Sequence, residues 1–255
     1  MGSAFPLKDT FAAERPGFDD LPLRKGGPKA SAWGLWGDDD ELGTLNLLTP
    51  SIVKAAAAEV VTGETVALKK LADIAKKTIT GRGVLLDWQS WATEQGIQID
   101  HFASHGIPLS QLQAVAAAQL VQVRRGDVLL VGTGWLPAYN ALSQEQKAAL
   151  PHRPVRSSCG VEASENAIRW HWDNALAAVA SDAVAYEAWP SPRLWGISMH
   201  EVFLSGLEMP IGESFDLEEL SVKCREAQRW SFMFVGVPLD VPGGVANPPG
   251  AVAIF

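Results

Sequence analysis

Apolar residues in this chain fall into short continuous runs separated by segments of helical periodicity. Runs of four to eight apolar residues bounded by turn residues are typical of buried strands. Such runs predict strands at ETVALKK, RGVLLDW, DVLLVGTGW and ALAAVAS, which are residues 64–70, 82–88, 127–135 and 175–181. Two further runs, WSFMFVGVPLDVP and AVAIF, predict closing strands at 230–242 and 251–255.

Helices are predicted between these strands. Thr49 and Pro50 have the character of an N-cap and a first-turn residue, and Ser143 opens a second helix in the same way. The predicted helices cover residues 51–61, 109–123, 144–150 and 164–174. Strand and helix therefore alternate along most of the chain, which predicts an α/β layered fold.

The stretch 196–220 contains the strongest candidate chemistry. His200 stands at the start of a short apolar helix, and Glu213 lies in a tight connection before a second helix. Asp216 and Glu219 have the spacing of a capping box that would start that helix. An imidazole and a carboxylate held on rigid backbone can share a divalent metal or transfer a proton. The structural alternative is a packed histidine and a solvated loop acid.

Other polar residues occupy positions where function is common. Asp87 and Asp182 each end a predicted strand, the place where open α/β sheets display functional groups. His101 and His105 have the i, i+4 spacing of metal ligands on a helix. The Gly and Pro residues that follow them favour a loop, which weakens that interpretation.

Composition excludes several classes of protein. The 255 residues have a formal net charge of −8 and contain no basic run, so nucleic acid is not an expected partner. No run reaches 18 apolar residues, so no membrane span is expected. Two cysteines, Cys159 and Cys224, do not form a disulfide framework in a chain of this size, and a reducing, cytoplasmic location is expected.

The length and the mean hydropathy of +0.05 predict one large domain with a substantial core. Residues 1–32 are rich in Pro, Gly and charge and are expected to form an extended N-terminal arm. Residues 33–255 are expected to form the α/β domain. Such arms often lie on a partner subunit, so we also expect a homo-oligomer.

Ten tryptophans make the chain rich in large aromatic rings. Most are expected in the core, but such rings also suit pockets that bind aromatic ligands. Trp135 and Trp195, together with Asp182, are the predicted pocket residues.

Several segments, taken in order, resemble the putative cyclase family, which includes bacterial kynurenine formamidases and isatin hydrolases. They are WGDDDELGTLNLLTPSIVKAA, GRGVLLDW, DVLLVGTGW, SDAVAYEAWP, MHEVFLSGLEMPIGESFDLEEL and VPLDVPGGVANPPGAVAIF. The resemblance covers nearly the whole chain and is closest to the longer, fungal-type branch. It implies a swivelling β/β/α domain that binds zinc or manganese and opens amides, lactams or formamides with a metal-activated water.

The resemblance also implies roles for individual residues. His200 and Glu213 correspond to the family's late His and Glu, which contribute to the metal site and to proton transfer. Asp182 lies where the family has an aspartate near the pocket. The aromatic surplus fits a small aromatic substrate, as in an arylformamidase of tryptophan catabolism.

The chain departs from the family pattern at one place. The family's main metal motif should precede GRGVLLDW, yet residues 64–82 contain no histidine. We infer that a segment is missing between Lys70 and Leu71. His200 and Glu213 supply two ligands, whereas a catalytic zinc usually has three from the protein.

Three functions therefore remain as hypotheses. The first is a metal-dependent hydrolase or cyclase acting on an aromatic amide, formamide or lactone. The second is a non-catalytic or truncated relative that lacks the main metal motif. The third, a hydrolase with a nucleophile such as Cys159 activated by His200, lacks the GxSxG pattern.

Overall fold

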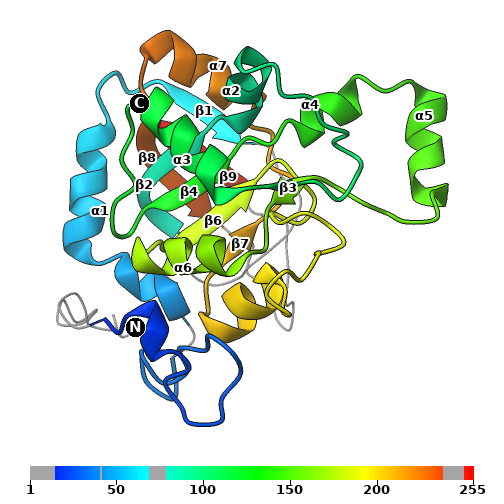
Figure 1. Ribbon diagram of the computed structural model, residues 1–255. Coiled ribbons are helices and arrows are strands. Elements are labelled where there is room, and N and C mark those ends of the chain that lie inside the picture. The colour runs from blue at the N-terminus through cyan, green and yellow to red at the C-terminus, as the bar shows by residue number, and fades with distance from the viewer. Residues whose placement is uncertain (1–14, 41, 69–78, 238–249) are drawn as a thin grey trace.

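A seven-stranded sheet forms the centre of the molecule, in the order β1-β9-β8-β2-β4-β6-β7 (Figure 1). The computed structural model describes residues 15–40, 42–68, 79–237 and 250–255. The strands are β1 (Thr65–Leu68), β2 (Ile79–Leu86), β4 (Val128–Val131), β6 (Ala178–Ser181), β7 (Ile211–Gly212), β8 (Ser231–Val237) and β9 (Gly250–Ile254).

The sheet is mixed, and its parallel half positions the candidate site. Strands β2, β4, β6 and β7 are parallel, while β8, β9 and β1 continue the sheet in antiparallel pairs. Leu86 is paired with Val131, and Val131 with Ser181, so these strands end at one edge. A separate small sheet, β3 (Gly106–Ile107) with β5 (Gly160–Val161), is also parallel.

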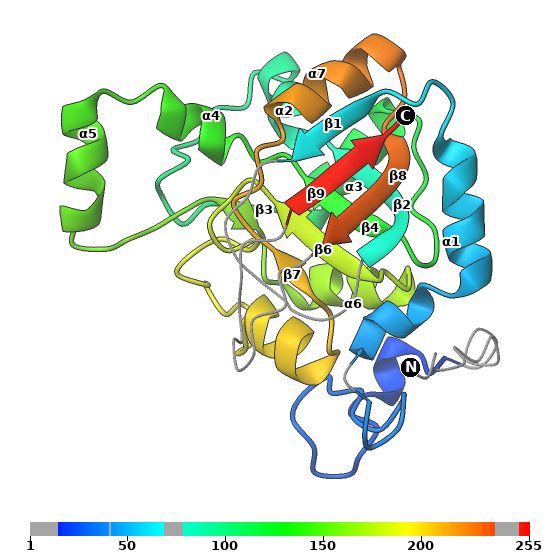
Figure 2. The same ribbon diagram turned by 180° about the vertical axis from the view of Figure 1, so that it is seen from behind.

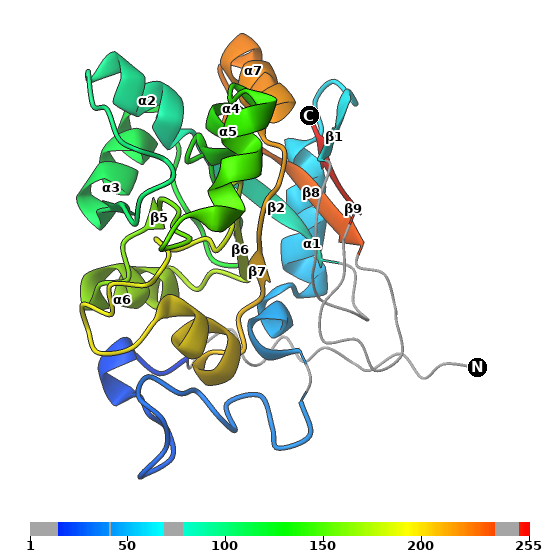
Figure 3. The same ribbon diagram turned by 90° about the vertical axis from the view of Figure 1, so that its right-hand side faces the viewer.

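Helices cover both faces of the sheet, which gives three layers (Figure 3). One face packs against α2 (Trp88–Glu94), α3 (Leu109–Ala118), α6 (Glu165–Asp173) and the π-helix η6 (Glu201–Gly206). The other packs against η3 (Gly43–Leu47), α1 (Pro50–Ala56) and α7 (Glu218–Ala227). Side chains along β2 alternate between the two cores, so Val84 and Leu86 belong to the first and Leu85 to the second. A strand buried on both faces explains the continuous apolar run in its sequence.

A segment of three short helices projects from the domain after β4. It consists of α4 (Trp135–Asn140), α5 (Gln144–Ala149) and η5 (Leu150–His152), none of which has a buried residue. Figures 1 and 2 show α5 projecting to one side. Its local structure comes from a capping box, in which Ser143 and Gln146 exchange hydrogen bonds.

The described part of the expected N-terminal arm packs against its own chain. Phe18, in the short η2 (Phe18–Asp20), is buried in the first core, and Asp19 pairs with Arg169 of α6 at 2.6 Å. The backbone amide of Ala32 donates to the carbonyl of Gly206 at 2.7 Å. Residues 1–14 lie outside the described residues.

Most predicted elements are confirmed. The N-caps Thr49, Ser143 and Ser164 each accept a backbone N–H in the first turn of a helix. The first of these helices continues into η4 (Ala57–Glu59) and ends before Gly63. The inferred deletion between Lys70 and Leu71 falls outside the described residues.

Four local expectations differ from the structure. Helix α3 ends at Ala118 rather than near 123, because Leu120 takes a left-handed backbone conformation with φ of 52°. Helix α2 was not expected. Helix α7 begins at Glu218 with Leu217 as its N-cap, so the predicted capping box does not form. Glu213 follows the short strand β7 instead of linking two helices.

Candidate active site

Two carboxylates hold the two ring nitrogens of His200. Nδ1 lies 2.8 Å from Oε1 of Glu187, and Nε2 lies 2.9 Å from Oε1 of Glu213. His200 immediately precedes η6, Glu187 lies in the loop after β6, and Glu213 follows β7. We call Glu187, His200 and Glu213 the Glu–His–Glu triad.

Glu187 is the buried end of the triad, with a side chain that is 0% exposed. It accepts the backbone N–H groups of Met199 at 3.0 Å and His200 at 2.9 Å. These groups lie at the start of η6, where backbone donors have no partner within the helix and the helix dipole favours an anion. Although burial would raise the pKa of Glu187, hydrogen bonds from His200 and these amides lower it below its usual value.

His200 is held in its charged form. Burial disfavours the imidazolium, but the hydrogen bonds to Glu187 and Glu213 outweigh it and raise the pKa of His200 to about 9. Both ring nitrogens therefore carry a proton at neutral pH, and each donates to a carboxylate. In this state both ring nitrogens act as donors.

Glu213 is the accessible end of the triad. Its side chain is 32% exposed, compared with 27% for His200. Oε1 of Glu213 is hydrogen-bonded to His200, whereas Oε2 of Glu213 has no hydrogen-bond partner among the described residues. The half-exposed ring of Trp189 lies with its centroid 6.4 Å from that of His200. An aromatic compound could therefore stack near this carboxylate.

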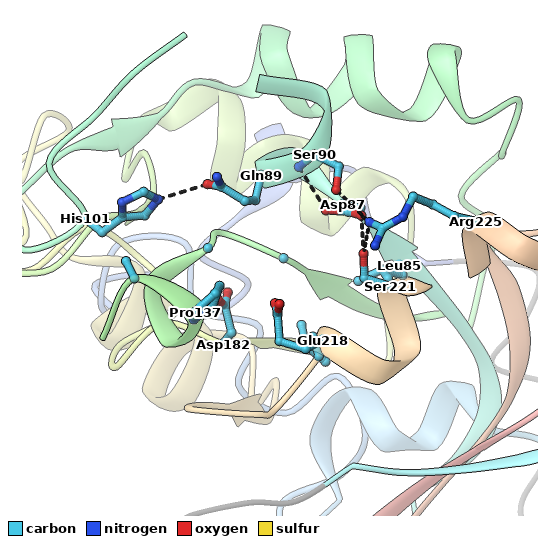
Figure 4. A pocket seen from close by; sticks show the side chains of 14 residues that line it. Leu85, Asp87, Gln89, Ser90, His101, Pro137, Asp182, Glu218, Ser221 and Arg225 are labelled. Carbon is cyan, nitrogen blue, oxygen red and sulfur yellow. Dashed lines mark hydrogen bonds and ion pairs between the residues drawn. The ribbon is translucent and has the colours of Figure 1, made fainter. Parts of the chain in front are cut away.

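A polar cavity of about 310 Å³ lies at the same edge of the sheet (Figure 4). It is bounded by the ends of β2, β4 and β6 and by the first turns of α7. Its lining residues are Leu85, Asp87, Gln89, Ser90, His101, Gly132, Gly134, Pro137, Ala138, Asp182, Leu217, Glu218, Ser221 and Arg225.

Asp182 is the buried carboxylate of this cavity. It accepts the N–H and the hydroxyl of Thr133 at 2.6 and 2.7 Å and the N–H of Leu136 at 3.3 Å. Burial outweighs these hydrogen bonds and raises the pKa of Asp182. Its hydrogen bonds to Thr133 and Leu136 stabilise the turn after β4, so Asp182 has a structural role as well as lining the cavity.

The opposite side of the cavity carries a salt bridge. Arg225 of α7 pairs with Asp87 at 2.9 Å, and Asp87 also accepts the N–H of Ser90 at 3.1 Å as the N-cap of α2. On the third side, Nε2 of His101 lies 2.9 Å from the amide oxygen of Gln89. Burial lowers the pKa of His101, so this ring is neutral at pH 7.

The triad and the cavity lie on opposite faces of the sheet. Ala180 pairs with Gly212, and side chains alternate along each strand. Ala180 and Asp182 therefore face α7, whereas Ile211, which belongs to the first core, and Glu213 face the other way. Among the described residues, neither His200 nor Glu213 lines the cavity.

The two predicted pocket tryptophans pack elsewhere. Trp135 stacks on Tyr139 of α4, with ring centroids 5.2 Å apart. Trp195 packs against Phe18 at 5.7 Å, with the ammonium group of Lys29 3.6 Å from its ring centroid. Neither ring lines the cavity. The partners of Trp195 are distant in sequence, whereas Tyr139 lies four residues after Trp135 in the same helix.

The remaining candidates have structural surroundings. Cys159 is buried, and burial raises the pKa of its thiol to about 12, so it forms no nucleophilic thiolate at neutral pH. His171 is fully buried between the carbonyl of Ala167 and the hydroxyl of Tyr186. His105 lies in a loop, and its carbonyl accepts the N–H of Gly160.

Sequence reasoning missed Glu187, the third member of the triad. It precedes His200 by 13 residues and is followed by Trp189 and Pro190, a pattern that matches no metal or catalytic motif. Only the return of the chain after residue 187 brings its carboxylate to the start of η6.

The donor set does not fit a catalytic zinc or manganese. No group of three His, Cys, Asp or Glu side chains among the described residues is arranged to hold a metal. All five histidines and both cysteines of the chain belong to the described residues. Both nitrogens of His200 are also occupied by carboxylates, so a third ligand and a free His nitrogen are lacking.

Comparison with solved structures establishes the class of fold. A crystal structure described as a novel cyclase aligns with a TM-score of 0.73 and 22% identity over 89% of this chain and 100% of that chain. An isatin hydrolase bound to the product analogue thioisatinate aligns with a TM-score of 0.51 and 13% identity over 69% of this chain and 60% of that chain. This is a mixed α/β, cyclase-like fold.

The family follows from the sequence comparison. The family model described as "Putative cyclase" matches residues 52–188, more than half of the chain. The chain belongs to this family, and the match together with the fold supports the class of hydrolases and cyclases. A search of curated proteins gives no match. Within the described residues, no helix is both long and apolar enough to cross a membrane.

Proposed function

We propose that this chain is a hydrolase or cyclase that opens a small aromatic amide, formamide or lactone at the Glu–His–Glu triad. The observation that carries the proposal is the pairing of His200 with Glu213 at 2.9 Å, at the edge of the sheet where parallel strands end. The family assignment supports it, because the match covers β2, β4, β6 and Glu187, although it ends at residue 188, before His200 and Glu213.

The triad's own residues suggest how water would be activated. Oε2 of Glu213 has no hydrogen-bond partner among the described residues, and His200 holds the other oxygen through an N⁺–H donor. Glu213 would accept a proton from a water molecule as the water oxygen attacks the substrate carbonyl carbon. The proton would then pass to the leaving nitrogen or oxygen, giving a carboxylic acid and an amine or alcohol.

Zinc or manganese is the expected cofactor by family resemblance, but the residues present do not fit it. The proposed chemistry therefore uses no step through a metal. A reducing compartment remains part of the proposal, since both cysteines are free and buried.

The first test is an assay of the purified chain on N-formylkynurenine, isatin and simple aryl esters, with and without added Zn²⁺ or Mn²⁺. We expect measurable hydrolysis that falls on the order of 100-fold or more in Glu213→Gln, because general-base catalysis contributes roughly 10²- to 10⁴-fold. Glu208→Gln is the matched control, because this half-buried acid after η6 does not contact His200.

The second candidate is a non-catalytic relative. The missing third metal ligand favours it specifically. A properly folded chain that hydrolyses none of these compounds, with either metal supplied, would establish this alternative and refute the proposed function.

A further inference from the structure

Glu187 can act on a reaction only through His200. Its side chain is 0% exposed, so it cannot touch a substrate. A buried carboxylate is costly unless its oxygens are fully hydrogen-bonded. Here Oε2 accepts the amide of Met199, while Oε1 accepts both the amide and the Nδ1–H of His200.

Backbone amides hold the carboxylate of Glu187 in place. Two hydrogen bonds come from consecutive amides at the start of η6, at 3.0 and 2.9 Å. These two hydrogen bonds do not involve the imidazole ring, so they hold the carboxylate independently of the orientation of the ring. The hydrogen bond to Nδ1, at 2.8 Å, then restricts the rotation of the His200 ring.

The orientation of the ring decides where its other nitrogen points. With Nδ1 held by Glu187, Nε2 faces Glu213 at 2.9 Å. His200 is 27% exposed, so without this hydrogen bond the ring has space to turn toward solvent. Glu213 would then lose its partner at Oε1, and its carboxylate would no longer be held.

We propose that Glu187 is the positioning residue of the proposed hydrolytic site: it fixes the His200 ring so that Nε2 holds Glu213 in its reactive orientation. This inference rests on the proposed function for its catalytic meaning. Its geometric content, the control of His200 by Glu187, can be measured separately.

The test compares Glu187→Gln and Glu187→Asp with the wild type. The glutamine keeps the shape but has only one acceptor oxygen, so it can keep the hydrogen bond of one of the two amides, which bind different oxygens of Glu187, and it removes the charge that holds Nδ1–H. We expect kcat to fall on the order of 10- to 100-fold, as for other residues that orient a catalytic histidine, with KM changed less than about 2-fold. The aspartate retains the charge and should recover part of kcat.

Glu201→Gln is the matched control. Glu201 also lies at the start of η6, but its carboxylate bonds to Ser198 and Arg193 and does not contact His200. We expect kcat and KM to be unchanged in this variant. A loss equal to that of Glu187→Gln would show that any change at this helix start lowers activity, and would overturn the positioning role.

Nitrogen NMR of the His200 ring separates this inference from the proposed function. In the wild type at pH 7 we expect proton signals on both Nδ1 and Nε2, and in Glu187→Gln loss of the Nδ1 signal and a shift at Nε2. Unchanged ring signals in Glu187→Gln would refute the inference. If the wild type hydrolyses nothing, the spectra still decide whether Glu187 controls His200. If the glutamine variant does not fold, the aspartate variant is compared instead: its shorter side chain moves the carboxylate away from Nδ1, so an Nδ1 signal identical to that of the wild type would refute the inference.

Discussion

At the scale of single residues, the buried carboxylate of Glu187 and the partly buried imidazole of His200 keep each other ionised. Glu187 has a lowered pKa and His200 a raised one, because each stabilises the charged form of the other. Removing one partner would leave an uncompensated charge in a site with little water. The triad therefore contributes to stability as well as to the proposed chemistry.

The charge on His200 predicts a specific loss of stability at alkaline pH. The pKa of His200 is about 9 in the folded chain and about 6.5 when unfolded. A raised folded-state pKa stabilises the fold fully below pH 6.5, and this stabilisation is lost as pH rises through 9. We expect the free energy of unfolding, measured by urea titration, to fall by about 3 kcal/mol between pH 6.5 and 10.

His200→Gln is the comparison for this prediction, since it removes the titrating ring. The variant should be less stable than the wild type at pH 6.5, and its stability should change less over the same range. Parallel pH profiles for the two proteins would contradict the assignment of a raised pKa to His200.

At the scale of elements, short strands place the candidate side chains. Strand β7 has only two residues, yet its pairing with β6 carries Glu213 to the edge of the sheet. Strand β5 lies beside the loop that contains Glu187, with Val161 bridged to Glu187 and its amide bonded to the carbonyl of Tyr186. The position of Glu187 therefore depends on how closely β5 approaches this loop.

Gly160 in β5 allows that close approach. A Cβ at this position would lie 2.3 Å from the carbonyl carbon of Glu187 and 2.6 Å from the carbonyl oxygen of Tyr186. Because backbone cannot yield like a flexible side chain, Gly160→Ala should push the Glu187 loop away from β5. We expect a loss of about 1–3 kcal/mol in urea unfolding and a weaker Nδ1 signal from His200.

Gly250→Ala serves as the control for this change. It also adds one methyl group to a strand glycine, but no atom of the described residues lies within 4 Å of the added carbon. Its stability and its His200 signals should match those of the wild type. Equal effects of the two substitutions would mean that β5 does not set the position of the Glu187 loop.

At the scale of the whole molecule, the described residues form a layered core but contain no group of three side chains arranged to hold a metal. Buried residues cover both faces of the parallel strands. The family's fold has thus been kept where the family's ligand motif is not found.

Metal content tests this view. After incubation with Zn²⁺ or Mn²⁺ and removal of the excess, we expect well below one metal ion per chain by elemental mass spectrometry, because too few protein ligands are arranged for a stable site. The thermal unfolding midpoint should be unchanged by a chelator. One tightly held ion per chain that is lost in His200→Ala would contradict this prediction and would make metal-assisted hydrolysis the mechanism to examine.

Local sequence patterns determined most of the elements of this protein. Apolar runs located the strands that carry Asp87 and Asp182, and the caps at Thr49, Ser143 and Ser164 located helix starts, because these signals depend on neighbours within a few residues. The order of the family segments also indicated the fold, which the comparison of structures confirmed.

Only the tertiary structure decided the composition of the site. Glu187 and Glu213 each lie 13 residues from His200, and they meet its two nitrogens because the chain reverses direction on either side. Long-range packing also placed Trp195 against Phe18 and separated Asp182 from the triad across the sheet. Sequence periodicity reports which face of an element is buried, whereas contacts between distant segments depend on how the layers close around one another.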